Sequence, residues 1–261
     1  MNDVIYGIHA VSEALKSRER RFEYVAISRD RTDPRMQRII DDCRSQGIAV
    51  RFVPREEIDR ATRTNTHQGV MAFTSQKVFS DIDELIASHR GEYVFLLVLD
   101  GVEDPHNLGA LLRSANGAGV DGAVIPERRA AGITGAVVKA SAGASEHVPV
   151  ARVVNIARTL EDLKERNVWT VGLDERATQC YDELDYNMNC ALVLGAEGKG
   201  LHDLVRRKCD LLVSIPMMGS VSSLNVSVAG GIVMYEILRQ RRARQAQSNP
   251  AGHTTKRGKA E

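Results

Sequence analysis

The chain has 261 residues, of which 43% are hydrophobic and 26% are charged. This length and composition suit one large domain or two smaller ones, each with an apolar core. The formal net charge of +1 excludes a uniformly basic nucleic-acid-binding protein, but a local basic patch remains compatible with RNA binding. Aromatic residues make up only 5% of the chain, so we do not expect RNA bases to stack on a large aromatic surface.

The cysteines at positions 43, 180, 190 and 209 form no Cys-x-x-Cys pair and have no His-x-x-x-His partner. A zinc site is therefore not expected. Scattered thiols without a secretion signal indicate a reducing, cytoplasmic environment. No apolar run approaches the roughly 20 residues that a membrane span needs. We expect neither a metal nor a membrane partner.

The first 75 residues alternate helical and strand patterns, as is typical of a small α/β domain. The amphipathic segment 35–46 is followed by Gly47, a residue that commonly ends helices. The polar segment 75–80 resembles a linker. The expected helices are 5–15, 35–46 and 55–61, and the expected strands are 22–28, 48–53 and 67–74.

The second part is larger and also alternates strands with helices, which predicts βαβ units and a mostly parallel sheet. Residues 93–99 form a continuous apolar run, typical of a strand buried on both faces. Ligand sites in such sheets lie beyond the carboxyl ends of the strands. The expected strands are 93–99, 122–126, 148–153, 168–173, 190–194 and 211–215, and the expected helices are 107–117, 135–145, 156–167, 201–209 and one after 223.

From Arg239 onward the chain is rich in Arg, Lys, Gln, Ser and Gly, with almost no apolar residue. This composition predicts a disordered basic segment, which we place at 241–261. Its functional interpretation is a weak electrostatic arm for nucleic acid.

Three loops that follow strands carry candidate functional residues. In the first, Asn107 is expected to cap a helix, and Arg113 lies nearly two helical turns further on. The alternative for Arg113 is a salt bridge on a solvated helix face. In the second, glycines surround Glu197 in Leu-Gly-Ala-Glu-Gly-Lys-Gly-Leu, which matches neither G-x-G-x-x-G nor a P-loop. The alternative for Glu197 is an exposed position on an ordinary glycine-rich turn.

The third loop begins at Pro216, which cannot continue a strand's hydrogen-bond ladder. Ser222 or Ser223 is expected to cap the following helix. The adjacent Gly230 and Gly231 inside that helix indicate that another element packs very close. Together the three loops predict a pocket rich in backbone groups, which suits an adenosine-like ligand.

Three segments resemble the motifs of the SpoU-type (TrmH-type) RNA ribose 2′-O-methyltransferases. They are DGVEDPHNLGALLRSA at 100–115, LVLGAEGKGL at 192–201 and SIPMMGSVSSLNVSVAGGI at 214–232. The segments GIHAVSEAL, HQGVMA and VPVARVVNIARTL resemble more narrowly the bacterial enzymes that methylate a guanosine ribose in large-subunit (23S) rRNA.

The resemblance implies a parallel-sheet SPOUT catalytic domain with a deep trefoil knot, and an N-terminal L30e-like RNA-binding domain. It also implies S-adenosyl-L-methionine as the cofactor, large-subunit rRNA as the substrate and a homodimer packed through the knotted domain. The corresponding domains are 1–75 for RNA binding, 76–90 for a linker and lead-in helix, and 91–240 for catalysis.

Carried over by position, the resemblance gives two sets of site residues. It implies that backbone groups of four residues hold the cofactor, namely Gly195, Ile215, Met217 and Leu224. It implies polar active-site roles for Asn107, Arg113, Glu197, Ser223 and Asn225. Arg113 would act as a base or, as we prefer, as a clamp on the target phosphate and the developing alkoxide. Glu197 would orient Arg113 or Asn225, and Ser223 and Asn225 would shape the methyl-donor pocket.

Other functions remain as alternatives to rRNA methylation. One is a tRNA ribose methyltransferase, and another is a non-catalytic RNA-binding protein in ribosome assembly. A nicotinamide oxidoreductase is disfavoured because its fingerprint loop is absent from this sequence. The sequence leaves open whether His9 and His67 contact RNA or contribute to domain packing.

Overall fold

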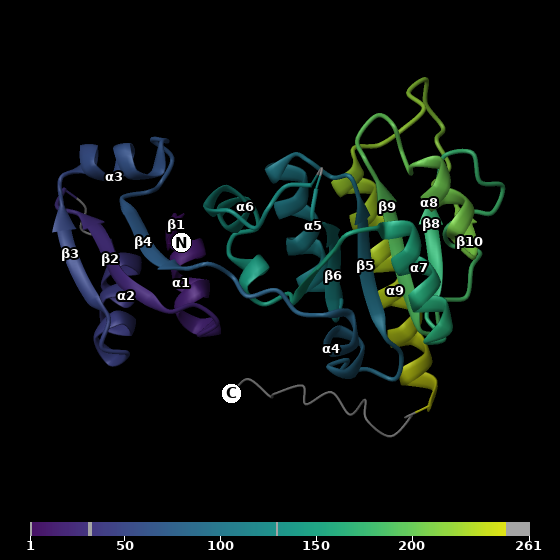
Figure 1. The fold of residues 1–261 in the computed structure, drawn as a ribbon, viewed down its shortest axis with the longest axis horizontal. Helices are drawn as coiled ribbons and strands as arrows, with labels where there is room; N and C mark the ends of the chain where they lie inside the picture. Colours follow the sequence, from purple (N-terminus) through teal and green to yellow (C-terminus); the bar gives the residue numbers. More distant parts are fainter. Residues whose placement is uncertain (1, 31–32, 129, 249–261) are drawn as a thin grey trace, which may run out of the picture.

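The computed structural model describes residues 2–30, 33–128 and 130–248. Two α/β parts, each built on its own sheet, lie side by side (Figure 1). Among the described residues, no helix is long and apolar enough to cross a bilayer.

The N-terminal part has a four-stranded mixed sheet in the order β1-β4-β2-β3. Strands β2 and β3 are parallel, whereas β4 runs antiparallel to both of its neighbours. Apolar residues of α1 and α2 pack on one face, and Ile58 of α3 packs on the other. The elements are β1 (Asn2–Tyr6), α1 (Ile8–Ser17), β2 (Phe22–Ser28), α2 (Pro34–Ser45), β3 (Ala49–Val53), α3 (Arg55–Thr62) and β4 (Val70–Ser75).

Strand β1 was not expected from the sequence, which predicted a helix from residue 5. Gly7 ends the strand with φ of 100° and lets the chain turn into α1 at Ile8. Residues 2–6 pair with β4 instead of starting the helix. The apolar residues of this short segment fit both the helical period and the strand period, so their spacing alone could not place the boundary between strand and helix.

The C-terminal part has a six-stranded sheet in the order β10-β8-β9-β5-β6-β7, and every pairing in it is parallel. The prediction of a mostly parallel sheet is confirmed. Its strands are β5 (Phe95–Asp100), β6 (Gly122–Pro126), β7 (Val150–Val153), β8 (Trp169–Leu173), β9 (Cys190–Gly195) and β10 (Leu211–Val213). Its helices are α4 (Ile82–Ala87), α5 (Pro105–Ala118), α6 (Gly135–Ala140), the 3-10 turn η1 (Ala144–Glu146), α7 (Ile156–Glu165), α8 (Asp203–Lys208) and α9 (Val226–Ser248).

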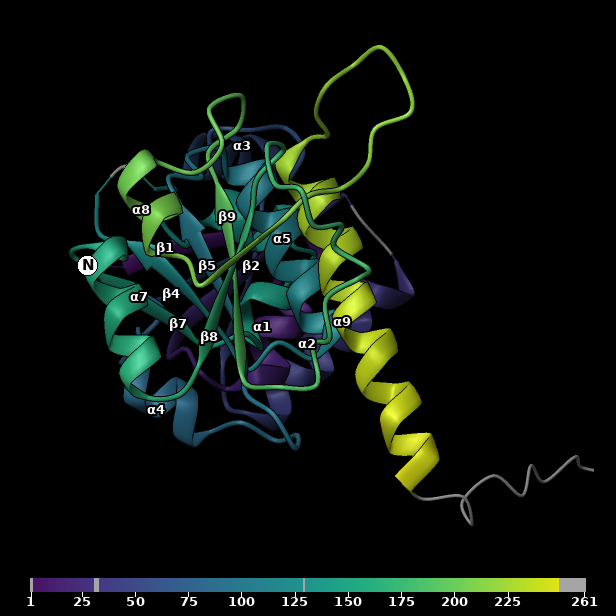
Figure 2. The same ribbon diagram turned by 90° about the vertical axis from the view of Figure 1, so that its right-hand side faces the viewer.

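Strand β5 is buried on both faces, as its apolar run predicted. Phe95, Leu97 and Leu99 belong to the core shared with α5 and α9. Leu96 and Val98 belong to the core under α4, α7 and α8. The helices therefore form a layer on each side of the sheet (Figure 2).

Helix starts differ from the expected caps at two places. The carboxylate of Asp104, not Asn107, accepts the hydrogen bond that caps α5. The side chain of Asn225, not Ser222 or Ser223, accepts from the Ser227 amide at the start of α9. The predicted helix 135–145 is broken by Gly143, whose φ of 85° separates α6 from η1.

The prediction of a disordered segment at 241–261 is wrong for residues 241–248, because α9 continues to Ser248. The Arg241 guanidinium donates to the backbone carbonyls of Tyr93, Val94 and Met188, beside the starts of β5 and β9. A basic residue that looked solvated by composition therefore anchors the helix. The rest of the predicted segment, 249–261, lies outside the described residues.

Of the two adjacent glycines in α9, only Gly230 is in a tight place. A Cβ atom there would lie 2.6 Å from methyl carbons of Leu111 and Leu194, both of which are buried. At Gly231 the nearest atom would be the Ser114 hydroxyl oxygen, at 3.7 Å. The close packing that the sequence indicated is thus confirmed for one glycine.

We expect Gly230→Ala to lower the free energy of unfolding by about 1–3 kcal/mol, because the buried leucines have little room to move. Gly231→Ala is the matched control, and it should raise that free energy by roughly 0.5–1 kcal/mol through helix propensity. Urea unfolding of both variants measures the difference. Equal effects at the two positions would contradict the packing described here.

Candidate active site

The loops that follow β8, β9 and β10 line one pocket of about 290 Å³ at the carboxyl edge of the large sheet. This is the edge where parallel α/β sheets bind ligands. The start of α9 closes the pocket through Val226 and Ala229. The lining residues are 173–176, 194–200, 215, 217, 222–224, 226 and 229.

The four positions expected to hold a cofactor, Gly195, Ile215, Met217 and Leu224, all line this pocket. Gly195 stands where β9 ends and the glycine-rich loop returns on itself. The amides and carbonyls of Ala196 and Gly200 are hydrogen-bonded to each other, which closes the loop. A Cβ atom on Gly195 would lie 2.0 Å from the Gly200 carbonyl carbon, so only glycine fits.

Three of the predicted polar residues meet in one hydrogen-bonded cluster. The Asn107 side-chain amide donates to Glu197 Oε2 at 2.8 Å. The Asn225 side-chain amide lies 3.0 Å from Asn107 Oδ1 and 3.3 Å from Glu197 Oε1. The cluster therefore joins α5, the loop after β9 and the start of α9 beside the pocket.

The two remaining predicted polar residues, Ser223 and Arg113, lie outside this hydrogen-bonded cluster. Ser223 is exposed and lines the pocket. Arg113 is exposed on α5 and does not line it. Among the described residues, the Arg113 guanidinium has no hydrogen-bond or ion-pair partner, so the alternative of a surface salt bridge is not observed. Of the two partners expected for Glu197, the structure has Asn225 and not Arg113.

Three residues after β8 also line the pocket and were not expected from the sequence, namely Asp174, Glu175 and Arg176. The Asp174 carboxylate is bound by the guanidinium groups of Arg176 and Arg206, with N–O distances of 3.1 and 2.8 Å. Burial raises the pKa of Asp174, but hydrogen bonds from Arg176 and the nearby positive charges bring it below its usual value. The rule that identified the loops after β9 and β10 also applies to the loop after β8.

His67 is fully buried in the N-terminal part, where it serves packing. Its Nε2 lies 2.8 Å from Asp59 Oδ1, and its Nδ1 accepts from the Gly69 amide. This answers the open question for His67. His9 is exposed on α1.

Comparisons with known proteins identify the family of both parts of the chain. Residues 94–235 match the SpoU rRNA Methylase family, and residues 4–79 match the RNA 2′-O ribose methyltransferase substrate binding domain. The chain is 45% identical over 253 residues to the putative TrmH family tRNA/rRNA methyltransferase YacO of Bacillus subtilis, covering 96% of this chain and 98% of that protein.

A second relative is the 23S rRNA (guanosine-2′-O-)-methyltransferase RlmB of Escherichia coli K12. It is 45% identical over 244 residues, which cover 92% of this chain and all 100% of that protein. A solved structure, the AdoMet-bound rRNA methyltransferase from Sinorhizobium meliloti, superposes with a TM-score of 0.75 at 25% identity and covers 91% of this chain and 87% of that one.

The fold defines a two-part α/β protein with a pocket at the strand ends of its larger sheet. The chain belongs to the SpoU rRNA methylase family. The resemblance drawn from the three motifs is thereby confirmed.

We expect Gly195→Ala to weaken S-adenosylmethionine binding by about tenfold or more, because the new methyl group overlaps the Gly200 backbone. Gly219→Ala is the control, since a Cβ there meets no atom within 4 Å. Isothermal titration calorimetry measures both affinities. Unchanged affinity in Gly195→Ala would show that the cofactor does not depend on this loop.

Proposed function

We propose that this protein transfers the methyl group of S-adenosylmethionine to the ribose 2′-oxygen of a guanosine in large-subunit rRNA. The observation that carries the proposal is the meeting of three strand-end segments around one pocket, with Asn107, Glu197 and Asn225 joined beside it. The full-length similarity to RlmB supports a guanosine in 23S rRNA as the target.

The residues of the pocket fit S-adenosylmethionine. Backbone groups at Gly195, Ile215, Met217 and Leu224 would hold its adenosine, and the glycine-only position at 195 keeps the loop close enough to do so. When bound, the cofactor supplies an electrophilic methyl group. Holding it beside the ribose hydroxyl removes much of the entropic barrier, an effect of about 7–11 kcal/mol.

Arg113 is proposed to grip the acceptor nucleotide. Its guanidinium is exposed and has no protein partner among the described residues, so it is available to a phosphate and to the oxygen that becomes negative during transfer. Because arginine keeps its charge in proteins, electrostatic stabilisation suits it better than proton abstraction. The Asn107–Glu197–Asn225 cluster holds α5 and α9 together, and Ser223 borders the pocket.

The two domains divide the work in this proposal. Residues 1–75, an L30e-like domain, would bind the RNA, residues 76–90 would connect, and the domain from 91 to the end of α9 would carry out the transfer. The match of 4–79 to a substrate-binding domain supports this division. We also propose that the C-terminal segment passes through the deep trefoil knot expected of a SPOUT domain. Since the proposed substrate is rRNA, the proposed location is the cytoplasm.

Exposed apolar residues support a homodimer through the C-terminal domain. Of the ten exposed large hydrophobic residues in the described part of the chain, five fall between 218 and 235. They lie on α9 and on the loop before it, which projects away from the body of the protein (Figure 2). These five are Met218, Val221, Leu224, Val228 and Tyr235.

We expect Val228→Glu to shift the protein toward monomers, because a buried interface would have to desolvate the new carboxylate. Val154→Glu is the control, since Val154 is exposed but lies far in sequence from the five apolar residues between 218 and 235. Sedimentation equilibrium measures the mass of both variants. A monomeric wild-type protein would contradict the proposed dimer.

The function is tested by mapping ribose methylation in 23S rRNA of cells that lack this protein. One guanosine should lose its 2′-O-methyl group and regain it when the wild-type gene is restored. Arg113→Ala should not restore it, although it should bind S-adenosylmethionine nearly as well as the wild type. If the missing methyl group lies instead on a tRNA, or if cofactor binding collapses in Arg113→Ala, the proposed substrate or the proposed role is wrong.

A further inference from the structure

The two domains touch along a seam in which their backbones come very close. On one side lie β1 and α1, and on the other lie α6 and η1 (Figure 1). A Cβ atom on Gly135 would lie 2.1 Å from the Val4 carbonyl oxygen. A Cβ atom on Gly143 would lie 2.5 Å from Glu13 Cβ. The small residues of the segment 135–145 thus permit direct contact with the N-terminal domain.

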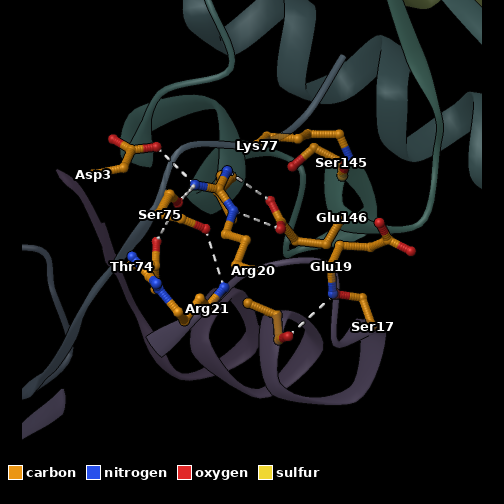
Figure 3. Close-up of polar contacts among 12 residues, drawn as sticks. Asp3, Ser17, Glu19, Arg20, Arg21, Thr74, Ser75, Lys77, Ser145 and Glu146 are labelled. Carbon is orange, nitrogen blue, oxygen red and sulfur yellow. Dashed lines mark hydrogen bonds and ion pairs between the residues drawn. The ribbon is translucent and has the colours of Figure 1, made fainter. Parts of the chain in front are cut away.

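A buried ion pair crosses this seam (Figure 3). Arg20, 4% exposed, belongs to the N-terminal domain, and Glu146, 2% exposed, belongs to the C-terminal domain. Arg20 Nε and Nη2 donate to the two Glu146 oxygens at 2.7 and 3.1 Å, in a bidentate arrangement. Arg20 Nη1 donates to Asp3 Oδ2 at 2.8 Å and to the Ser75 carbonyl at 3.2 Å.

The linker is attached to the same place. Lys77, 8% exposed, donates from Nζ to the Ser145 carbonyl at 2.7 Å (Figure 3). Burial lowers the pKa of Lys77, and the nearby Glu146 carboxylate opposes that shift. The Ser145 backbone amide in turn donates to the Ser141 hydroxyl. Two cations and one carboxylate are therefore buried within one contact between the domains.

Such a group of charges adds orientation more than affinity. Removing ions from water carries a penalty that their attraction offsets only when the geometry is good, so a hydrophobic contact would hold the domains at least as well. A bidentate arginine–carboxylate pair satisfies all its hydrogen bonds at one relative orientation only. Any sliding along the seam would leave a buried charge unpaired.

We propose that the Arg20–Glu146 pair positions the substrate-binding domain, so that RNA bound to that domain presents its ribose to the cofactor pocket. Arg20 does not line the cofactor pocket, and it acts through Glu146 as a positioning residue. The proposal rests on the proposed function, since it assigns the orientation a task in RNA methylation.

The kinetic consequence follows from the separation of binding and transfer. RNA contacts made by the N-terminal domain persist when the pair is broken, so KM should change little. Only the fraction of bound complexes in the productive orientation falls, and this fraction enters kcat.

The test uses Arg20→Met in the full-length protein, with an rRNA fragment as substrate. We expect kcat per S-adenosylmethionine-binding site to fall by about tenfold or more, while cofactor affinity stays unchanged. Counting binding sites by calorimetry separates this effect from a loss of folded protein. Small-angle X-ray scattering should show a larger radius of gyration in the variant. Arg20→Lys, which keeps the charge but cannot form the bidentate contact, should recover part of the activity.

His147→Ala is the matched control on the same seam. His147 pairs with Glu13 across the domains at 2.8 Å, but both side chains are partly exposed. Loss of such a pair has a small effect, so activity and scattering should remain those of the wild type. If Arg20→Met yields no soluble protein, Glu146→Gln removes the same charge pair and carries the same test.

Two results would overturn the proposal. The first is wild-type kcat in Arg20→Met together with an unchanged scattering curve. The second is a parallel fall of cofactor affinity and kcat, which would make Arg20 a merely structural residue. Failure of the wild-type protein to methylate any large-subunit rRNA is a different outcome: it would remove the proposed function, while scattering would still report whether the pair fixes the orientation.

Discussion

The site depends on the hydrogen bonds that the Glu197 carboxylate accepts. This carboxylate accepts from Asn107 on α5 and from Asn225 at the start of α9, so one side chain ties two helices to the loop after β9. These segments are far apart in the sequence and meet only because β9 lies beside β5 and β8 in the sheet. The link thereby fixes the end of the loop after β10 beside the pocket.

Glycine makes this arrangement possible at two levels. At Gly195 it lets the loop close on its own backbone, and at Gly230 it brings α9 against α5 and β9. At Gly195, main-chain atoms therefore come together in the lining of the pocket. Such a surface suits an adenosine, whose edges are read by amides and carbonyls, and leaves the polar side chains for the reacting end of the ligand.

Much of this could be predicted from the sequence. The apolar run of β5 and the alternation of strands and helices predicted the parallel sheet, and the strand-end rule brought Glu197 and Leu224 to one edge. The motifs supplied the family. What spacing could not supply was any contact that depends on the tertiary fold. Asn225 rather than a serine caps α9, and Arg241 binds backbone carbonyls that only the folded sheet presents. The pairing of Arg20 with Glu146, 126 residues apart, is of the same kind.

We propose that the strand-end pocket holds the methyl donor next to the Asn107–Glu197–Asn225 cluster. A crystal structure of the protein with S-adenosylmethionine tests this most directly. The account predicts adenosine density between the loops after β9 and β10, in contact with the backbone at Gly195 and Leu224, and a sulfonium facing the polar cluster. Density for the cofactor at any other place on the protein, with this pocket filled by water, would contradict it.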